Sequence, residues 1–452
     1  MKKLSLFTTA LIALGIVSQA SASSTATIGS TTYTVVYITG STAFRANVFT
    51  AVENNVFDSN SYTTQPASGL SGSSSKYNIY GNIGGVPYLL SFDFTGSEAG
   101  LAALQDVAVS NPNTAPTLSG YSSGTVNLPG TPLPTAFVNP LGGAAVTAQP
   151  DLAFADTSRA VSLTAANVVL KDYGIVAVIP FTWAKGVFTT PDSSWNDLVN
   201  ITDPQANLLL STEQTASFFT GNVNDQDDVY LIGRNKGSGT RVNTMLDTLH
   251  GVNNGVVQYV PGNTTYSGGA LTVGTVESLA TAGLVEVDND GFDSGGGVAN
   301  TLLFPVDGAL DQYSSQIITV GYLGFADFNG TDYGHGVIPL TLNGVEESDG
   351  AIQNGTYSFW GHEHLYGTVG QASTSPGGKI AQLLAGTTVN ESLGTAFHST
   401  GALESSFGLT GGGRELNPLA ATAVSGTASA ALDAATVHAD KAGDAGYASQ
   451  QN

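Results

Sequence analysis

A glycine-rich run at 233–241, Gly-Arg-Asn-Lys-Gly-Ser-Gly-Thr-Arg, constrains this chain more than any other feature. It follows a strand-like segment at 228–232 and opens a helix with apolar residues at helical spacing, namely Val242, Met245, Leu246 and Leu249. A turn at a helix N-terminus presents backbone N–H groups and the positive end of the helix dipole, which together favour an anion. The hydroxyls of Ser238 and Thr240 and the guanidinium of Arg234 add donors suited to a tetrahedral oxyanion.

Two other interpretations of this run need weighing. A nucleotide P-loop requires a lysine directly after its last glycine, whereas here Ser238 follows Gly237. An ordinary strand–turn–helix corner, in which the glycines serve only the geometry of the turn, stays open from this run alone.

Residues 1–22 have the pattern of a secretory signal peptide. Lys2 and Lys3 precede an apolar run at 4–17, and Ala20-Ser21-Ala22 matches a small-residue cleavage site. No later stretch approaches about 18 consecutive apolar residues, so we expect no membrane insertion. The sequence contains no cysteine, which excludes a disulfide framework, thiolate chemistry and a lipid-carrying cysteine after the signal. We therefore expect a periplasmic or secreted protein.

The charge balance is strongly acidic. Removal of Lys2 and Lys3 with the signal leaves 35 acidic residues against 11 basic ones (13 less two), a net charge of −24 instead of −22. Such a surface argues against nucleic acid and anionic membranes as partners. It also opposes long-range attraction of a small anion, so an anion site has to act through short hydrogen bonds in a closed cleft.

Short apolar runs alternate with helical patterns, which indicates an α/β architecture. The expected strands are Thr34–Thr39, Asp151–Ala155, Gly174–Ile179, Asp228–Ile232, Ile317–Phe325 and Val337–Leu342. The expected helices are one marked by Phe44, Val48 and Val52, one at Ser97–Asp106 and one at Ser211–Phe219. The last has Ser211 and Gln214 in capping-box spacing and Gly221 as its stop. About 430 mature residues suggest two domains or one two-lobed protein.

Residues 110–150 form a long insertion with seven prolines and no clear periodicity. Insertions of this length without secondary structure are usually functional covers or disordered segments. We expect this one to cover part of a ligand cleft or to form a docking surface, and disordered decoration is the alternative.

Three further turns carry hydroxyl groups directly after strand-like segments. They are Gly40-Ser41-Thr42, Gly96-Ser97-Glu98 and Asp156-Thr157-Ser158. In open α/β sheets, ligands bind at the carboxyl ends of strands, where such turns lie. Each turn alone is weak evidence for a binding site, because Ser and Thr are ordinary helix caps. Together with the 233–241 run, the turns predict one shared anion site.

These motifs and their order resemble the phosphate-binding proteins of bacterial ABC transporters. Residues 234–240 are similar to that family's Arg-x-x-Gly-Ser-Gly-Thr phosphate loop, and 218–223 to its Phe-Ser-Gly-Lys-Ile segment. Residues 318–324 are similar to its Gly-Ala-Ile-Gly-Tyr-Val strand, and 354–360 to its Asn-Gly-Thr-Tyr-Pro-Leu-Trp return segment. The ordered matches span about Val36 to Tyr366.

The resemblance implies a two-lobed type II periplasmic binding protein fold, which is an α/β fold with a hinged ligand cleft. The signal peptide would occupy 1–22, the first lobe 23–181, and the second lobe 182–344. Residues 345–452 would return to the first lobe and end in a tail, with hinges near 178–182 and 340–344.

The resemblance also implies a function and a ligand set. The protein would be a non-enzymatic monomer that captures inorganic phosphate, or a related tetrahedral oxyanion, for the permease subunits of an ABC importer. It would need no cofactor, no metal and no catalytic residue. The implied phosphate ligands are Ser41, Thr42, Ser97, Asp156, Arg234, Ser238, Gly239 and Thr240.

Two carboxyl groups bear on selectivity. Asp156 would accept the proton that phosphate keeps near neutral pH and would reject fully ionised sulfate, because a buried unpaired charge is costly. Glu98 stands where the family has a small residue, and it would repel an anion if it pointed inward.

Alternatives come from other residues. His362 and His364 share a strand face and suggest metal ligands, although no third ligand is evident nearby, and the family's return strand is the alternative. Residues 288–293 suggest a calcium loop but lack the glycine and glutamate positions of an EF-hand, and a solvated turn is the alternative.

The sequence has no Gly-x-Ser-x-Gly elbow, which disfavours a hydrolase. The alternative function is a secreted structural or adhesion protein that retains the fold without transport.

Overall fold

The computed structural model describes residues 24–72, 74–105, 136–158, 161–163, 170–267, 270–275, 278–305, 316–328, 337–353, 355–368, 370–385 and 403. The expected signal peptide, the first part of the 110–150 insertion and nearly all of the C-terminal tail lie outside these residues. No helix in the described ranges is long and apolar enough to span a membrane.

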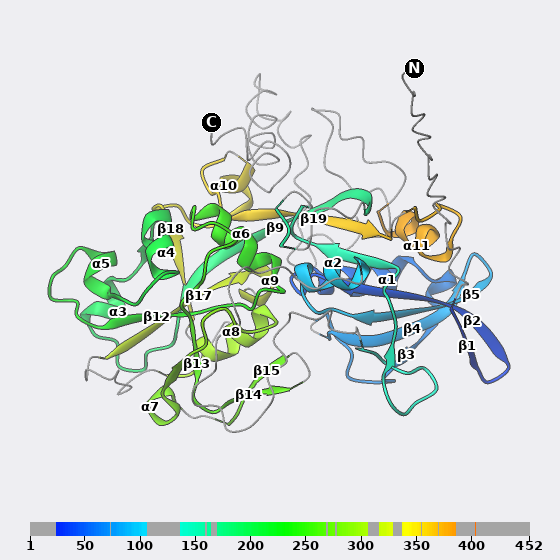
Figure 1. Ribbon diagram of the computed structural model, residues 1–452, viewed down its shortest axis with the longest axis horizontal. Coiled ribbons are helices and arrows are strands. Elements are labelled where there is room, and N and C mark those ends of the chain that lie inside the picture. Colours follow the sequence, from blue (N-terminus) through cyan, green and yellow to red (C-terminus); the bar gives the residue numbers. More distant parts are fainter. Residues whose placement is uncertain are drawn as a thin grey trace, which may run out of the picture.

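The described chain forms two lobes (Figure 1). The first lobe, blue and cyan with the orange helix, contains β1 (Thr25–Ile28), β2 (Thr31–Gly40), α1 (Arg45–Asn55), η1 (Asp58–Asn60), β3 (Tyr62–Gln65), β4 (Lys76–Ile83), β5 (Val86–Asp93), α2 (Ser97–Gln105), β6 (Ala136–Phe137), β7 (Val146–Thr147), β8 (Leu152–Ala155) and α11 (Pro376–Ala385).

The second lobe is green and yellow in Figure 1 and contains elements that lie in sequence between β9 and β19. They are α3 (Ser193–Asp197), β10 (Asn200–Ile201), α4 (Asp203–Leu209), β11 (Gln214–Thr215), α5 (Ala216–Thr220), β12 (Asp228–Ile232), α6 (Gly239–Asp247), β13 (Tyr259–Pro261), β14 (Thr264–Ser267), β15 (Ala270–Val273), α7 (Leu279–Ala282), β16 (Leu284–Glu286), α8 (Gly295–Leu302), β17 (Ile317–Gly324), α9 (Phe325–Phe328) and β18 (Ile338–Leu342). At the junction lie β9 (Lys171–Lys185), α10 (Asp349–Gln353) and β19 (Trp360–Gly367).

One sheet runs through both lobes in the order β11-β12-β17-β9-β19-β8-β2-β5-β4-β3. In the first lobe β2 is parallel to β5 and β8, while β19 is antiparallel to β8 and β9. Within this sheet β19, which comes late in the sequence, is inserted between β8 and β9. The expectation of a two-lobed α/β fold is confirmed.

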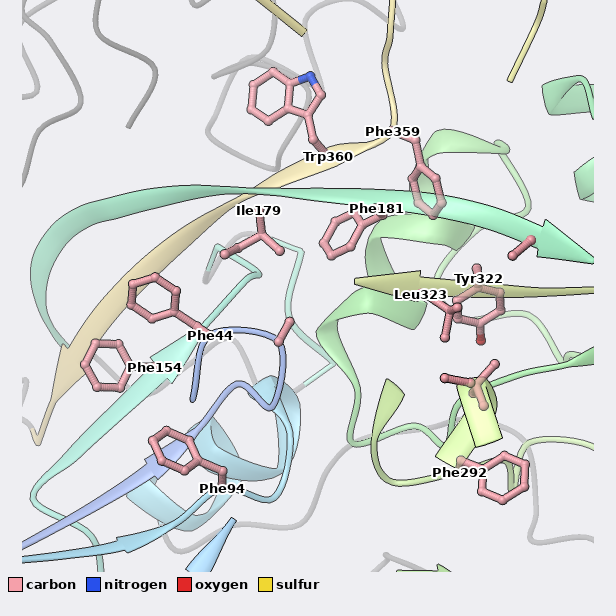
Figure 2. Close-up of a cluster of buried hydrophobic side chains, with 14 of the residues drawn as sticks. Phe44, Phe94, Phe154, Ile179, Phe181, Phe292, Tyr322, Leu323, Phe359 and Trp360 are labelled. Carbon is pink, nitrogen blue, oxygen red and sulfur yellow. The ribbon is translucent and has the colours of Figure 1, made fainter. Parts of the chain in front are cut away.

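Strand β9 belongs to both lobes. It pairs with β19 up to Pro180 and then, from Phe181 to Lys185, with β17. Aromatic rings pack around this crossing: the centroids of Phe181 and Phe359 are 5.3 Å apart, and those of Trp183 and Tyr322 are 5.5 Å apart. Figure 2 shows Phe181, Phe359 and Tyr322 grouped at this crossing. The expected hinge at 178–182 falls inside this packed strand, and the numerical lobe boundaries stay predictions.

The six expected strands correspond to β2, β8, β9, β12, β17 and β18, with differences only at their ends. The helix expected at Ser211–Phe219 is wrong in its first half. Gln214 and Thr215 form β11, which pairs with the start of β12, and α5 begins only at Ala216. The backbone N–H of Ala216 donates to the Asp227 carbonyl at 2.7 Å. The hydrogen-bond partner of this amide is therefore the segment that leads into β12 and not a preceding helical turn.

The capping box and the helix stop expected in this region differ in outcome. The capping box in this region lies one helix earlier, where Thr202 and Gln205 bond reciprocally at the start of α4. Gly221 does end α5, with a left-handed φ of 74°. Ser211 and Gln214 have the spacing of a capping box but do not start a helix, and the capping box that does form lies nine residues earlier.

The described end of the 110–150 insertion forms its own small hairpin, β6–β7, on the first-lobe sheet. The ring of Phe137 packs 4.6 Å from that of Tyr37 on β2, and the Ala136 amide donates to Asp93 on β5 at 3.0 Å. The hairpin pairs with itself and adds no strand to the large sheet.

Candidate anion-binding site

The glycine-rich run joins β12 to α6, as expected. Ser238 caps α6: its hydroxyl accepts from the Arg241 amide at 3.2 Å. Gly239 and Thr240 are the first helical residues, so their amides have no partner inside the helix. Because Ser238 and Thr240 are almost completely buried, the positive end of this helix lies in the protein interior.

Arg234 is the cation of this region and is 1% exposed. Its side chain donates to the carbonyls of Phe292 and Asp293 at 3.1 and 2.8 Å. Its Nη2 also donates to the Thr42 hydroxyl at 3.2 Å, which links the second lobe to the first. Its Nη1 is buried and has no hydrogen-bond partner among the described residues. Burial lowers the pKa of Arg234, and the carboxyl groups of Asp327 and Asp293 act in the opposite direction.

Asp156 follows directly after β8 and is 1% exposed. Its Oδ1 accepts from the Ser97 hydroxyl at 2.5 Å, and its Oδ2 accepts from the Thr240 hydroxyl at 3.4 Å. Burial raises the pKa of Asp156, while the Ser97 hydrogen bond and the charge of Arg234 lower it. Three of the expected turns therefore meet at this carboxyl group.

Backbone contacts bring the lobes together at the same place. The Gly237 carbonyl accepts from the amides of Glu98 and Ala99, in the first turn of α2, at 3.0 and 3.2 Å. A Cβ on Gly96 would lie 2.5 Å from that carbonyl oxygen. Gly96, with a φ of +108°, therefore permits both the turn and the close approach of the 233–241 run.

The turn after β2 adds the last two expected residues. Ser41 is 1% exposed; its amide donates to the Phe154 carbonyl at 2.8 Å, and its hydroxyl has no hydrogen-bond partner among the described residues. Thr42 accepts from Arg234 as described above. The structure thus brings together seven of the expected residues, namely Ser41, Thr42, Ser97, Asp156, Arg234, Gly239 and Thr240. The hydroxyl of Ser238 serves as a helix cap, and phosphate binding by all eight stays a prediction.

Glu98 is buried and hydrogen-bonded. Its two oxygens accept from the hydroxyls of Thr157 and Ser162, both at 2.6 Å. Both hydroxyls belong to the segment that follows β8, so the hydrogen bonds hold the Glu98 carboxyl group against that segment. The two donors offset the unfavourable free energy of burying the carboxyl group.

Sequence reasoning missed several residues that shape this region. Asn243 donates to the carbonyls of Asp156 and Gly239 at 2.7 and 3.1 Å, which ties α6 to the end of β8. Arg45, the first residue of α1, pairs with Asp327 of α9 at 3.6 Å, and both side chains are 9% exposed. Neither Asn243 nor Arg45 belongs to a motif in the sequence, because their partners Asp156 and Asp327 lie far away along the chain.

Glu363 stands between His362 and His364 and was not expected to belong to the site. It lies in β19, is 0% exposed, and neither of its oxygens has a hydrogen-bond partner among the described residues. Burial raises the pKa of Glu363 well above its ordinary value, the nearby charge of Asp156 raises it further, and the Ser41 hydroxyl lowers it. The local sequence, in which Glu363 stands between two histidines, carries no signal for this burial, which follows from the pairing of β19 with β8 and β9.

The residues suspected of metal binding have other contacts. Nδ1 of His364 lies 3.5 Å from Asp172. The Asn289 carbonyl accepts from Arg241 at 2.8 Å, and the carbonyls of Phe292 and Asp293 accept from Arg234. The 288–293 loop therefore holds the two arginines. Within the described ranges, no group of three His, Asp or Glu side chains is placed to hold a metal ion.

No protein-family model and no curated protein matches the sequence. Among solved structures, the chain is similar to a phosphate-binding protein from Stenotrophomonas maltophilia, with 12% identity, 82% of this chain and 88% of that chain covered, and a TM-score of 0.39. A protein from Clostridium perfringens, assigned as a phosphate ABC transporter substrate-binding protein and solved with bound phosphate, has 14% identity, coverages of 77% and 90%, and a TM-score of 0.37.

An ABC-type phosphate transport receptor from Vibrio cholerae has 13% identity, coverages of 52% and 77%, and a TM-score of 0.28. Because these TM-scores are low, what the chain binds has to be judged from its own residues. The names of all three proteins refer to phosphate binding or phosphate transport.

Proposed function

We propose that this chain is an exported, non-enzymatic solute-binding protein that captures inorganic phosphate, or a related tetrahedral oxyanion, between its two lobes. One observation carries the proposal. The unpartnered Nη1 of buried Arg234, the N-terminus of α6 and the hydroxyl-bonded carboxyl group of Asp156 gather where the lobes touch.

The donors of this group suit an oxyanion. Arg234 supplies the positive charge, and Ser41, Thr42, Ser97 and Thr240 supply hydroxyl groups that can rotate toward a ligand. Gly239 and Thr240 add backbone amides at the positive end of a helix. Ser238 contributes by holding that helix end in place.

Asp156 gives the group its selectivity. A protonated oxygen of phosphate donates a hydrogen bond to this carboxylate, whereas sulfate at neutral pH has no proton to donate. Sulfate would leave two negative charges facing each other in a buried site, and that desolvated repulsion would exclude it.

The proposal extends to transport. Residues 1–22 would direct export, the lobes would divide at 181/182 and 344/345, and the closed monomer would dock on the permease subunits of an ABC importer. Genes for permease subunits beside the gene of this protein would support the transport role, and their absence would favour the structural or adhesion alternative.

The direct test is calorimetric titration of the mature chain, from residue 23 onward, with phosphate, arsenate, sulfate and molybdate. We expect tight binding of phosphate and arsenate and rejection of sulfate. Absence of phosphate binding by folded protein would refute the proposal.

A further inference from the structure

A buried carboxyl group beside the candidate site is unused by the proposed binding mode. Glu363 sits in the middle of β19, opposite Ala177 of β9, and the next residue, His364, pairs with Ala155 at the end of β8. It is completely buried, and its two oxygens have no hydrogen-bond partner in the part of the chain that the structure describes. Burial of such a group without a partner is unfavourable and calls for an explanation.

Two polar groups of the candidate site lie near Glu363. The turn after β2 brings the Ser41 hydroxyl near it, and the end of β8 brings the carboxyl group of Asp156. Its partner on β9 is the uncharged Ala177, and on β19 itself His362 and His364 alternate to the opposite face. Across the described residues no cation forms an ion pair with it, and the hydrogen bonds of Arg234 go to Thr42 and to the carbonyls of Phe292 and Asp293.

We propose that Glu363 makes anion capture depend on one proton: as a neutral acid it supplies a hydrogen-bond donor beside Ser41, and as a carboxylate it repels the anion. This inference rests on the proposed function, because it concerns the same site. It assigns Glu363 as a specificity-determining residue that favours capture under acidic conditions.

Charge balance explains the direction. An ionised Asp156 offsets the charge of Arg234, and the carboxyl groups of Asp327 and Asp293 also act on Arg234, so little positive charge is left for an incoming anion. A further carboxylate would give the site a net negative charge before the ligand arrives, in surroundings from which water is excluded. Burial raises the pKa of Glu363 in accordance with this, because the neutral form is the one that the fold tolerates.

The experiment is a calorimetric titration with inorganic phosphate between about pH 6 and about pH 9, in two buffers that differ in ionisation enthalpy. The wild type is compared with Glu363→Gln, which keeps the shape and stays neutral. Above the pKa of Glu363, the affinity of the wild type should fall relative to the variant by up to about tenfold per pH unit. The wild type should also take up more protons on binding than the variant does.

The matched control is Glu346→Gln, the same chemical change at an exposed residue, which should follow the wild-type profile. Identical pH profiles and proton uptake for the wild type and Glu363→Gln would overturn the inference while leaving phosphate binding intact. Loss of phosphate binding by the wild type at every pH would instead refute the proposed function, and the inference with it.

A second measurement avoids the variant in case it does not fold. Carbon-13 labelling of glutamate carboxyl groups in the wild type should reveal one signal that titrates far above the others and moves when phosphate is added. A spectrum in which no such glutamate signal responds to phosphate would also overturn the inference.

Discussion

The carboxyl group of Asp156 lies directly against Gly239, because a Cβ on that glycine would be only 1.6 Å from Oδ1. Asp156 comes from the end of a first-lobe strand, and Gly239 is the first residue of α6 in the second lobe. The acid therefore rests at the positive end of the helix, where the dipole favours negative charge. Glycine at 239 is required by this approach and not by an unusual backbone angle.

Replacement of Gly239 by alanine should separate helix propensity from site geometry. Alanine favours a helix by roughly 0.5–1 kcal/mol over glycine, yet here its methyl group would displace Asp156. We expect phosphate affinity to fall by about tenfold or more, measured by calorimetry. Gly350→Ala in α10 is the matched control, since a Cβ there meets nothing within 4 Å, and it should leave binding unchanged. Equal affinities for both variants would contradict the assigned contact.

Arg234→Ala should remove the cation of the site. Loss of a buried charged partner typically costs about 2–5 kcal/mol, which corresponds to a reduction in phosphate affinity of about 30-fold or more. Arg234→Lys keeps the charge but not the forked geometry that reaches Thr42 and Asp293, so it should recover only part of the affinity. Circular dichroism would verify folding, and unchanged affinity in folded Arg234→Ala would refute the role of this loop.

Asp156→Asn should alter selectivity more than affinity. The amide cannot repel sulfate as a carboxylate does, so sulfate binding should appear while phosphate binding weakens modestly. Competition of sulfate against phosphate, measured for both proteins, tests this. If sulfate is rejected equally by the wild type and the variant, selectivity lies elsewhere, and Glu98 is the next residue to substitute.

Stability should depend on pH through Asp151. Burial raises its pKa to about 6, although the Tyr37 amide that donates to it at 2.9 Å acts in the opposite direction. Because the folded state holds this proton more tightly than the unfolded state, the stabilisation is complete below about pH 4 and is lost as the pH rises through about 6.

The test compares the wild type with Asp151→Asn by urea unfolding at about pH 4 and about pH 8. The free energy of unfolding of the wild type, relative to the variant, should fall by about 2–3 kcal/mol over this range. Asp349→Asn provides the background for removing an exposed carboxyl group. If the difference in free energy of unfolding between the wild type and Asp151→Asn does not change with pH, the pKa of Asp151 is not raised in the folded protein.

Local patterns in the sequence predicted the strands and the turns well, because their apolar runs and hydroxyl-rich ends are contiguous. Thr42, Ser97, Asp156, Arg234 and Thr240 could be named before the structure, since each stands in a short motif. The helix start at Ser211 was misplaced because a capping spacing does not show which residues the neighbouring strand β12 will satisfy.

The remaining features depend on contacts between distant parts of the chain. Glu363 reads as one more polar residue in the sequence, and only the pairing of β19 with β8 and β9 puts it next to Ser41 and Asp156. The ion pair of Arg45 and Asp327 joins residues almost three hundred positions apart, and no local pattern encodes it.

The bond between the Gly237 carbonyl and the first amides of α2 has a kinetic consequence. If phosphate binds at Arg234 and Asp156, as we propose, the burial of both residues requires the lobes to separate before it can enter, and separation breaks these contacts. Access is therefore gated by a conformational step that precedes binding. The observed association rate should rise with phosphate concentration only until it reaches a plateau, whose value is the rate at which the protein opens.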